Sequence, residues 1–377
     1  MKHAIKACLL GFFISTGMSA QVENYLSKRN KYNTNVSSIN ISPDGKLLLA
    51  GFGDGSFRVL DPESLEVKLE VPQAHSRAVN AMDMPPKMDF ILSAGDKTMK
   101  LWDLSGKKIG NLNAHATNIW NAEISHDGKH LVSSAFNKTF LLWDMYNGVV
   151  LEKMRSHEDV TMAVCFSPDD RWIASGSNDL NIKIWDLESR QVIKTFHGPT
   201  QDVYDLSFSP DNRLLAVASK DKSIRIYNLE KDSLIHNLKG HRDMVMEVEF
   251  SPDGQTLISG SADQSIYLWD VASGERLYAY LENEAAVLDL VFHPDGKSFY
   301  SVSFAKDLTR WELSDEIFVI KYFEKPYREA LNADPIFEAR RKGESKKDFQ
   351  LRQREAAAKK KEILNKYYQL YLSKTGS

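Results

Sequence analysis

Residues 245–270 read VMEVEFSPDGQTLISGSADQSIYLWD, and this stretch decides the fold. Its first six residues alternate between apolar and polar, which predicts a strand with one buried face. The segment SPDG at residues 251–254 predicts a tight turn, and two further short strands follow it, separated by a turn at residues 262–264. Gly274 then reverses the chain into a fourth strand at residues 276–280. The stretch therefore predicts a small antiparallel sheet of four strands.

The end of this stretch recurs along the chain. The third predicted strand of each copy ends in Trp-Asp or a variant of it, at successive intervals of 42, 41, 42, 42, 42 and 42 residues. A fixed period of this length indicates a repeat protein, because so small a sheet must bury its apolar faces on neighbouring copies. The seven landmark pairs are Leu60-Asp61, Trp102-Asp103, Trp143-Asp144, Trp185-Asp186, Tyr227-Asn228, Trp269-Asp270 and Trp311-Glu312.

These turns and Trp-Asp ends, together with Gly240-His241 before the sixth copy, resemble the WD40-repeat family. The resemblance covers residues 33–322 and implies an all-β fold, a seven-bladed β-propeller with four-stranded blades around a central channel. One strand must close the ring. The candidates are residues 317–322 and residues 23–26. We favour residues 317–322, because their Ile, Phe and Val suit a sheet better.

The resemblance also implies a hydrogen-bonded network inside the blades, made by a His, a Ser, an Asp and the landmark Trp. Ser, His and Asp also form catalytic triads. Their recurrence in blade after blade favours a structural role, because buried polar groups must be paired. Blades two, four and six carry full sets, while blade three has Asn137, blade five has Val217 and blade seven has Ala305 as replacements. The matching residues are His75, Ser93, Asp96 and Trp102; His115, Ser133 and Trp143; His157, Ser175, Asp179 and Trp185; His197, Asp221 and Tyr227; and His241, Ser259, Asp263 and Trp269.

Residues 1–20 predict a secretory signal peptide. Two lysines precede an apolar run that extends to Met18, and the small residues Ser19 and Ala20 follow. The run is too short for a stable membrane-spanning helix. We expect cleavage after Ala20, with cleavage after Ser19 or an uncleaved segment as alternatives. The mature chain then starts with a short N-terminal segment, residues 21–32, and resembles exported bacterial proteins of the periplasm, the cell surface or the medium.

Charge is distributed unevenly along the chain. The 377 residues include 48 Lys and Arg and 51 Asp and Glu, for a net charge of −3, but residues 323–377 carry +6 and residues 33–322 carry −13. An acidic body with a basic tail is not the distribution of a nucleic-acid-binding protein. Cys165 is the one cysteine that remains after signal removal, so an internal disulfide is excluded and a core position is expected.

The basic tail, residues 323–377, predicts a linker followed by an amphipathic helix. Residues 344–373 lack Pro and Gly and are rich in residues that favour helix. Apolar residues recur every seven positions, and the opposite face is basic. This helix is expected to dock on the acidic propeller, to bind a partner or dimerise, or to contact an anionic surface. The apolar positions are Phe349, Ala356, Ile363 and Leu370.

Function is expected where the seven copies differ from one another. Large apolar side chains gather at the loop-bearing channel mouth of blades three, five, six and seven, and Asp159 and Asp202 add acid at one side. Aromatic and Met side chains at an exposed site are typical of binding hot spots. The alternative is that these side chains plug the channel. The predicted partner-binding residues are Trp120, Phe136, Tyr204, Met244, Met246, Leu288 and Phe304.

No cofactor or metal motif is expected, because the histidines are already assigned to separate blades. Asp205, Glu247 and Asp289 occupy equivalent positions on successive blades and are candidates for a cation ring, with a solvated acidic ring as the alternative. The sequence predicts a non-enzymatic scaffold for an unidentified protein or peptide partner, without a membrane-spanning segment after signal removal. The alternatives are a propeller enzyme, a hydrolase or lyase, and a cation-binding propeller with its site at the channel mouth.

Overall fold

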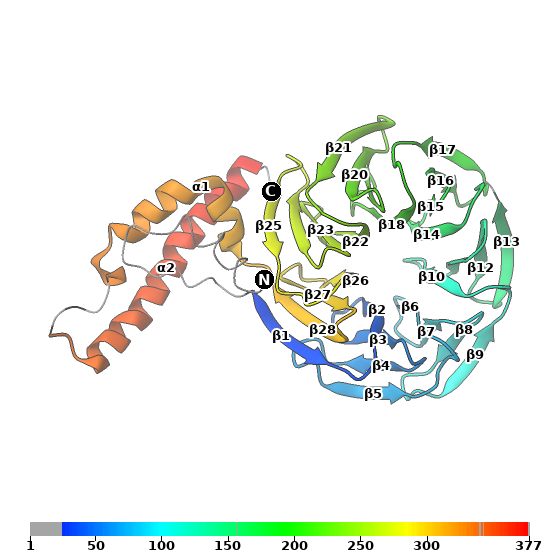
Figure 1. Ribbon diagram of the computed structural model, residues 1–377, viewed down its shortest axis with the longest axis horizontal. Coiled ribbons are helices and arrows are strands. Elements are labelled where there is room, and N and C mark those ends of the chain that lie inside the picture. The colour runs from blue at the N-terminus through cyan, green and yellow to red at the C-terminus, as the bar shows by residue number, and fades with distance from the viewer. Residues whose placement is uncertain (1–24, 156, 339–340, 342, 376–377) are drawn as a thin grey trace, which may run out of the picture. The chain divides into compact units, whose positions relative to one another are not determined.

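The alternating stretches fold into strands, and four strands form each of seven antiparallel sheets. The structure is a computed structural model that describes residues 25–155, 157–338, 341 and 343–375. Figure 1 shows the seven sheets arranged as blades around one axis, with the first strand of each blade nearest to it. The expected seven-bladed β-propeller is therefore confirmed. The predicted signal peptide lies outside the described residues.

The blades follow one another in chain order. Blades one to three consist of β2–β5 (Val36–Ile41, Leu48–Phe52, Phe57–Leu60, Val67–Val71), β6–β9 (Ala81–Asp83, Ile91–Ala94, Met99–Trp102, Lys108–Leu112) and β10–β13 (Ile119–Ile124, His130–Ala135, Thr139–Asp144, Val149–Arg155). Blades four to six consist of β14–β17 (Thr161–Phe166, Trp172–Ser177, Ile182–Asp186, Val192–Phe196), β18–β21 (Val203–Phe208, Leu214–Ser219, Ser223–Asn228, Ser233–Lys239) and β22–β25 (Val245–Phe250, Thr256–Ser261, Ile266–Asp270, Arg276–Tyr280). Blade seven combines β26–β28 (Val287–Phe292, Ser298–Ser303, Asp307–Glu312) with β1 (Leu26–Lys31).

The first turn of each blade is held by its own side chains. In blade six the Ser251 hydroxyl donates to Asp253 Oδ1 at 2.6 Å and accepts the N–H of Thr256 at 3.0 Å. Gly254 has a φ of 71°, in the left-handed region that glycine tolerates best. This chemistry explains why Ser-Pro-Asp-Gly predicts the turn so well.

Ring closure differs from the expectation. The prediction that residues 317–322 form the closing strand is wrong, because these residues lie in helix α1 (Asp315–Asn332). Ser314 caps this helix by accepting the N–H of Glu316 at 3.2 Å, and two acidic residues occupy its first turn, where the helix dipole favours them. Strand β1 closes the ring instead by pairing antiparallel with β28. The propeller therefore runs from residue 26 to residue 313, in place of the expected 33–322.

The apolar core lies in layers between neighbouring blades. Trp185 of blade four is 4% exposed and meets Phe140 of blade three edge to face, with ring centroids 5.3 Å apart. Cys165 is buried in the layer between blades four and five, as expected. Burial raises the pKa of its thiol well above the ordinary value.

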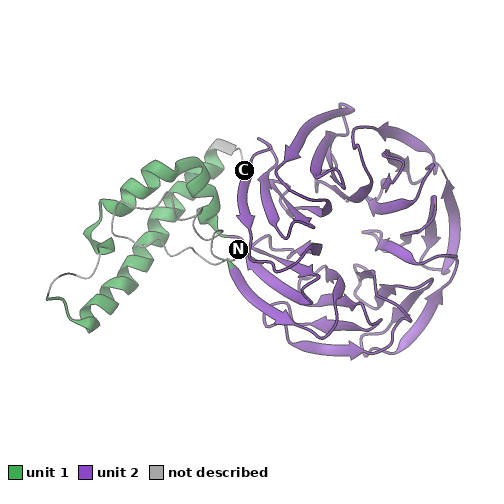
Figure 2. Cartoon of the chain, viewed as in Figure 1, with its two compact units in different colours: residues 1–25, 314–377 green, residues 26–313 purple. Residues whose placement is uncertain are grey.

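Residues 314–377 belong to a second compact unit, shown in Figure 2. Its described part contains α1, the short helix η1 (Pro335–Phe337) and α2 (Lys346–Thr375). Helix α2 confirms the predicted tail helix, whereas α1 was not predicted. A kink at Phe323 divides α1, and Pro326 follows within the helix. In the part of the chain that the structure describes, we find no helix with the length and hydropathy of a membrane span.

Aromatic side chains join the two helices of this unit. Tyr371 of α2 packs on Phe318 and Tyr322 of α1, with both pairs of ring centroids 5.2 Å apart. Lys360 pairs with the buried Glu316 at 2.9 Å. Helix α1 thus covers an aromatic face of α2, while Leu370 of the predicted stripe stays 41% exposed. The three uses expected for the tail, docking on the propeller, binding a partner and contacting an anionic surface, stay predictions.

Candidate functional site

Six of the seven inner strands share a local irregularity in their pairing. In these six, β6 being the exception, the pairing register with the second strand shifts after the first residue. The residue at the shift has no partner opposite, which is a β-bulge, and bulges redirect a side chain. The bulged residues are Ser37, Trp120, Met162, Tyr204, Met246 and Leu288.

A cavity of about 610 Å³ opens among the inner strands, and five of the seven predicted side chains line it. They come from four blades: Trp120, Tyr204, Met246, Leu288 and Phe304. We call these five residues the collar. The size is within the range of about 300–1,000 Å³ that ligand pockets occupy.

The other two predicted residues lie beside the cavity rather than along it. Phe136 is 49% exposed and meets Trp120 edge to face, with ring centroids 5.2 Å apart and an interplanar angle of 88°. Met244 is half-buried, and its carbonyl accepts the N–H of Ala262 at 3.0 Å. Phe136 therefore extends the collar outward, whereas Met244 belongs to the rim of blade six.

The acidic rim expected from Asp159 and Asp202 is not formed as predicted. Asp202 pairs with Lys220 at 2.9 Å, so its charge is balanced at the rim. In blade four the bulge makes Met162 the equivalent of Trp120, and the N–H of Asn178 bonds to the Val160 carbonyl. Val160 therefore holds the rim position that Asn118 and Asp202 hold in their blades, in agreement with the 42-residue spacing, and Asp159 lies one residue before it. Met162 is 4% exposed and does not contribute to the collar.

Acid gathers deeper in the channel instead. Five carboxylates line the cavity, and among the described lining residues the only side chain with a basic nitrogen is His126. Burial is the largest cause that raises their pKa values, to about 6 for Asp205 and to about 8 for Glu249 and Asp289. The five carboxylates are Glu123, Asp205, Glu247, Glu249 and Asp289.

Four of these five carboxylates bridge neighbouring blades. Asp205 accepts the N–H of Val248 at 3.0 Å, and Glu249 accepts the N–H of Phe292 at 2.7 Å. Glu123 accepts the N–H of Phe166 at 3.1 Å. The inner strand of each blade is an edge strand, so these bonds satisfy N–H groups that its own sheet leaves unpaired. The fourth, Asp289, accepts the N–H of Ile39 and so joins blade seven to blade one.

Glu247 stands apart from the other four. Its carboxyl group hydrogen-bonds to that of Asp205, an interaction that raises the pKa of Glu247 and lowers that of Asp205. The two buried carboxyl groups therefore share a proton. Burial and the repulsion from Asp205 and Asp289 together raise the pKa of Glu247 well above its ordinary value. Within the described residues, no group of three or more His, Cys, Asp or Glu side chains could hold a metal ion.

The polar network inside the blades is confirmed in the blades with full sets. In blade four His157 Nε2 lies 2.8 Å from Ser175 Oγ, and Trp185 Nε1 donates to the same oxygen at 2.8 Å. His157 Nδ1 lies 3.0 Å from Asp179, and burial lowers the pKa of this histidine. Blades two and six repeat these contacts.

Blades three and five depart from this network in different ways. In blade three the His115–Ser133–Trp143 part is retained. In blade five His197 is exposed and contacts Asn181 Oδ1 at 2.6 Å, while Asp221 pairs with Arg225 at 2.9 Å. The prediction that His197 and Asp221 act together is therefore wrong.

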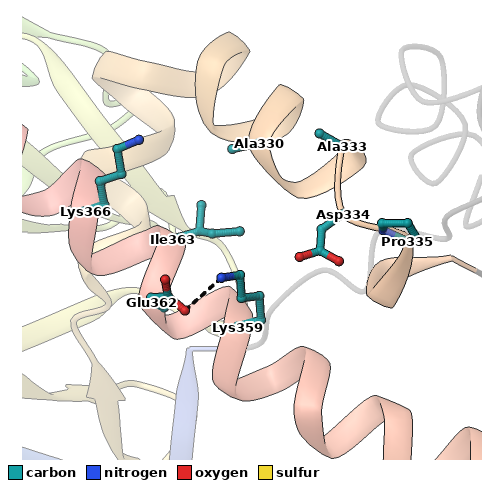
Figure 3. A pocket seen from close by; sticks show the side chains of 8 residues that line it. All are labelled: Ala330, Ala333, Asp334, Pro335, Lys359, Glu362, Ile363 and Lys366. Atoms are coloured by element: carbon teal, nitrogen blue, oxygen red, sulfur yellow. Dashed lines mark hydrogen bonds and ion pairs between the residues drawn. The ribbon is translucent and has the colours of Figure 1, made fainter.

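The helical unit holds a second hollow, of about 570 Å³ (Figure 3). Side chains of both charge signs surround it, and Lys359 pairs with Glu362 at 3.0 Å. Ile363, a member of the predicted apolar stripe, lies along it. The hollow is open and its charges are balanced, so the channel cavity is the stronger candidate for a site.

Comparison with known proteins agrees with this architecture. The family model described as "WD domain, G-beta repeat" matches residues 26–61, 67–103, 106–144, 148–186, 190–228 and 232–270. Each match ends at a landmark pair and begins in or near the outer strand of the preceding blade, so the sequence repeat is offset from the blade by one strand. The matched segments do not include β26–β28, where the network histidine is absent and Ala305 replaces the Asp.

Curated relatives share part of the chain. The LEC14B protein of Lithospermum erythrorhizon is 30% identical over 150 residues, which are 38% of this chain and 30% of that protein. Nuclear distribution protein PAC1 of Candida albicans is 26% identical over 129 residues, 33% of this chain and 26% of that protein. U3 small nucleolar RNA-associated protein 12 of Saccharomyces cerevisiae is 29% identical over 159 residues, 37% of this chain and 16% of that protein.

The chain thus spans less than a third of the length of each of these relatives. The six matched segments, however, make up more than half of the chain itself. Together with seven four-stranded blades and the repeated Trp–Ser–His network, they establish that the chain belongs to the WD40 repeat family.

Proposed function

We propose that the chain is a non-enzymatic scaffold that binds a protein or peptide partner at the mouth of the propeller channel. The observation that carries this proposal is the convergence of the five collar side chains, from four blades, on one cavity. Four of the five stand on β-bulges of inner strands. Regular pairing between the first and second strands is thus interrupted at each of these four large apolar side chains.

Exposure at the mouth favours binding over the alternative of a channel plug. Phe304 is 55% exposed and Phe136 is 49% exposed, whereas side chains that only fill a channel are expected to be covered. Covering the exposed half of one such ring with a partner contributes about 1 kcal/mol, so several of them together reach the scale of an interface hot spot. WD40 propellers generally bind protein partners, which fits this use of the mouth.

The alternative of a propeller enzyme has weaker support. The Ser hydroxyls that could act as nucleophiles already bond to Trp and His inside their blades, as Ser175 does. Four of the five channel carboxylates bond to backbone N–H groups of the next blade, and the fifth, Glu247, bonds to Asp205. These hydroxyl and carboxyl groups therefore make bonds within the fold, and a scaffold accounts for their presence without a catalytic reaction.

We also propose that the scaffold acts outside the cytoplasm, on the strength of the signal-peptide pattern in residues 1–20. Its partner is then an envelope or extracellular protein. The relatives named as a nuclear distribution protein and a nucleolar RNA-associated protein share the repeat with this chain, and their settings are not carried over to it.

Affinity capture from the cell-envelope fraction tests the proposal. The bait is the mature chain, compared with a Trp120→Ala, Tyr204→Ala double variant. Tyr146→Ala is the matched control, because Tyr146 is an aromatic residue that is 95% exposed and lies outside the cavity lining. Proteins held by the wild type and the control but lost from the double variant, at an unchanged melting temperature, support the proposal. Identical captured sets from all three baits would contradict it.

A further inference from the structure

The channel cavity has two zones that follow from strand geometry. The collar residues on bulges occupy the second position of their inner strands, and the carboxylates occupy the third and fifth positions. A strand rises about 3.3 Å per residue, so the carboxylates extend to about 10 Å beyond the collar along the channel. A ligand that enters at the mouth therefore meets apolar and aromatic surface first and acid second.

The deeper zone is strongly one-sided in charge. It presents five carboxyl groups, and no Lys or Arg occurs among the described residues that line the cavity. The nearby rim cation, Lys220, is paired with Asp202. His126, the remaining lining residue with a basic nitrogen, is exposed and contacts Asp170 at 3.0 Å.

Glu247 is the carboxyl group best placed to receive a charged donor. Asp205, Glu249 and Asp289 each accept a backbone N–H, whereas Glu247 shares a proton with Asp205. A carboxylate has about four acceptor sites, so this pair keeps acceptor capacity once its proton leaves. Burial and the repulsion from Asp205 and Asp289 favour the protonated state of Glu247, and an incoming positive charge would offset that repulsion.

We propose that the cavity receives one Lys or Arg side chain of the partner, with the aliphatic stem against the collar and the charged group among Asp205, Glu247 and Asp289. This inference rests on the proposed function and names the chemistry of the partner. Lys and Arg combine a long apolar stem with a terminal positive charge. The charged end would reach the acidic zone while the stem stays in the apolar zone at the mouth. The rings of Trp120, Tyr204 and Phe304 also favour a cation over their faces. A bare metal ion has no stem, and the described residues form no metal cluster.

Panning a displayed library of short random peptides on the full-length chain tests the inference. We select peptides that bind the wild type and the Tyr146→Ala control but do not bind Trp120→Ala. Such peptides bind at the channel mouth. Among these peptides we expect one shared position to hold Lys or Arg. Replacing that Lys by norleucine, or that Arg by citrulline, removes the charge and retains most of the stem. The replacement should weaken binding about tenfold or more.

The protein side is tested with Glu247→Gln. This variant should weaken the basic peptide and leave the norleucine or citrulline peptide unchanged, because the two changes remove the same interaction. The peptide replacement alone, measured on the wild type, decides the question if Glu247→Gln fails to fold.

The outcomes separate the two proposals. Mouth-dependent peptides with no shared basic residue, or a basic residue whose charge does not matter, overturn this inference and leave the scaffold function standing. A library that yields no peptide dependent on Trp120 overturns both.

Discussion

The Asp289 carboxylate in the last blade accepts a hydrogen bond of 2.8 Å from the backbone N–H of Ile39 in the first blade. The same kind of bond joins blades two and three through Asp83, which accepts the N–H of Ile124 at 2.7 Å. Acidic side chains thus tie the inner edges of neighbouring blades together. Their burial has a measurable cost, because it raises the pKa of each carboxyl group.

Stability should fall as pH rises from 6.5 to 8. Burial raises the pKa of Glu249 from 4.5 to about 8 and that of Asp289 from 3.8 to about 8, so the folded chain binds more protons than the unfolded chain between those values. The free energy of unfolding therefore decreases with pH across that window. Below 6.5 the buried His75 and His157, whose pKa values are lowered, act in the opposite direction.

Melting temperatures measured from pH 6.5 to 8 check this expectation. Asp289→Asn and Glu249→Gln should each flatten the decline, because the amide oxygen still accepts the backbone N–H and does not titrate. A slope that is the same in the wild type and in both variants would show that these carboxyl groups do not govern it.

Ser175→Ala should destabilise the chain more than Ser301→Ala. The Ser175 hydroxyl contacts both His157 and Trp185, whereas Ser301 serves Trp311 in the blade without the histidine. Loss of Ser175 leaves two buried polar groups without this partner, at a cost of about 1–3 kcal/mol. Urea unfolding of the two variants measures the difference. Equal losses would mean that the histidine adds nothing to the network.

Removal of residues 1–31 should open the ring. Arg29 of β1 donates to Thr309 Oγ1 of β28 at 2.9 Å, and β1 covers the outer edge of β28. Without β1 that edge is unpaired, and unpaired edges promote aggregation. A chain that lacks residues 1–31 should melt well below a chain that lacks residues 1–20 and should aggregate in size-exclusion chromatography. Coincident melting curves would argue against closure by β1.

The mature N-terminus should be Gln21. Mass spectrometry of the protein purified from its native envelope or medium should give the mass of residues 21–377. A mass that corresponds to residues 20–377 would favour cleavage after Ser19 instead. Recovery of the full-length chain from the cytoplasm would contradict the export proposal.

The regular features of this fold could be predicted from the sequence, because the same residue types recur at the same positions in successive repeats. The landmark Trp185 and its partner Ser175 occur at fixed distances in copy after copy, so their shared role is visible without a structure. The five collar residues could be predicted in the same way, because the copies differ at two equivalent positions, that of Trp120 and that of Phe304. The turn residues Ser251 and Asp253 act locally, through bonds that span two residues.

Features that depend on register or on capping could not be predicted in this way. Met162 follows Trp120 and precedes Tyr204 by 42 residues and stands on the same bulge, but it is 4% exposed, and the spacing does not reveal this burial. Residues 317–322 have strand-like composition, but the Ser314 cap and the acidic first turn favour helix. Glu123 and Glu249 were missed, although they stand at one equivalent position in two blades, two residues beyond the position of Asp205.

The pairing of β1 with β28 also has a consequence for biosynthesis. Arg29 and Thr309, which meet across this seam, are separated by 280 residues. During synthesis the first strand emerges long before its partner, so six blades can form while the ring is still open. A chain that stops early lacks β28 and can never complete the circle. Closure by the first strand therefore requires that synthesis has passed residue 312, the end of β28.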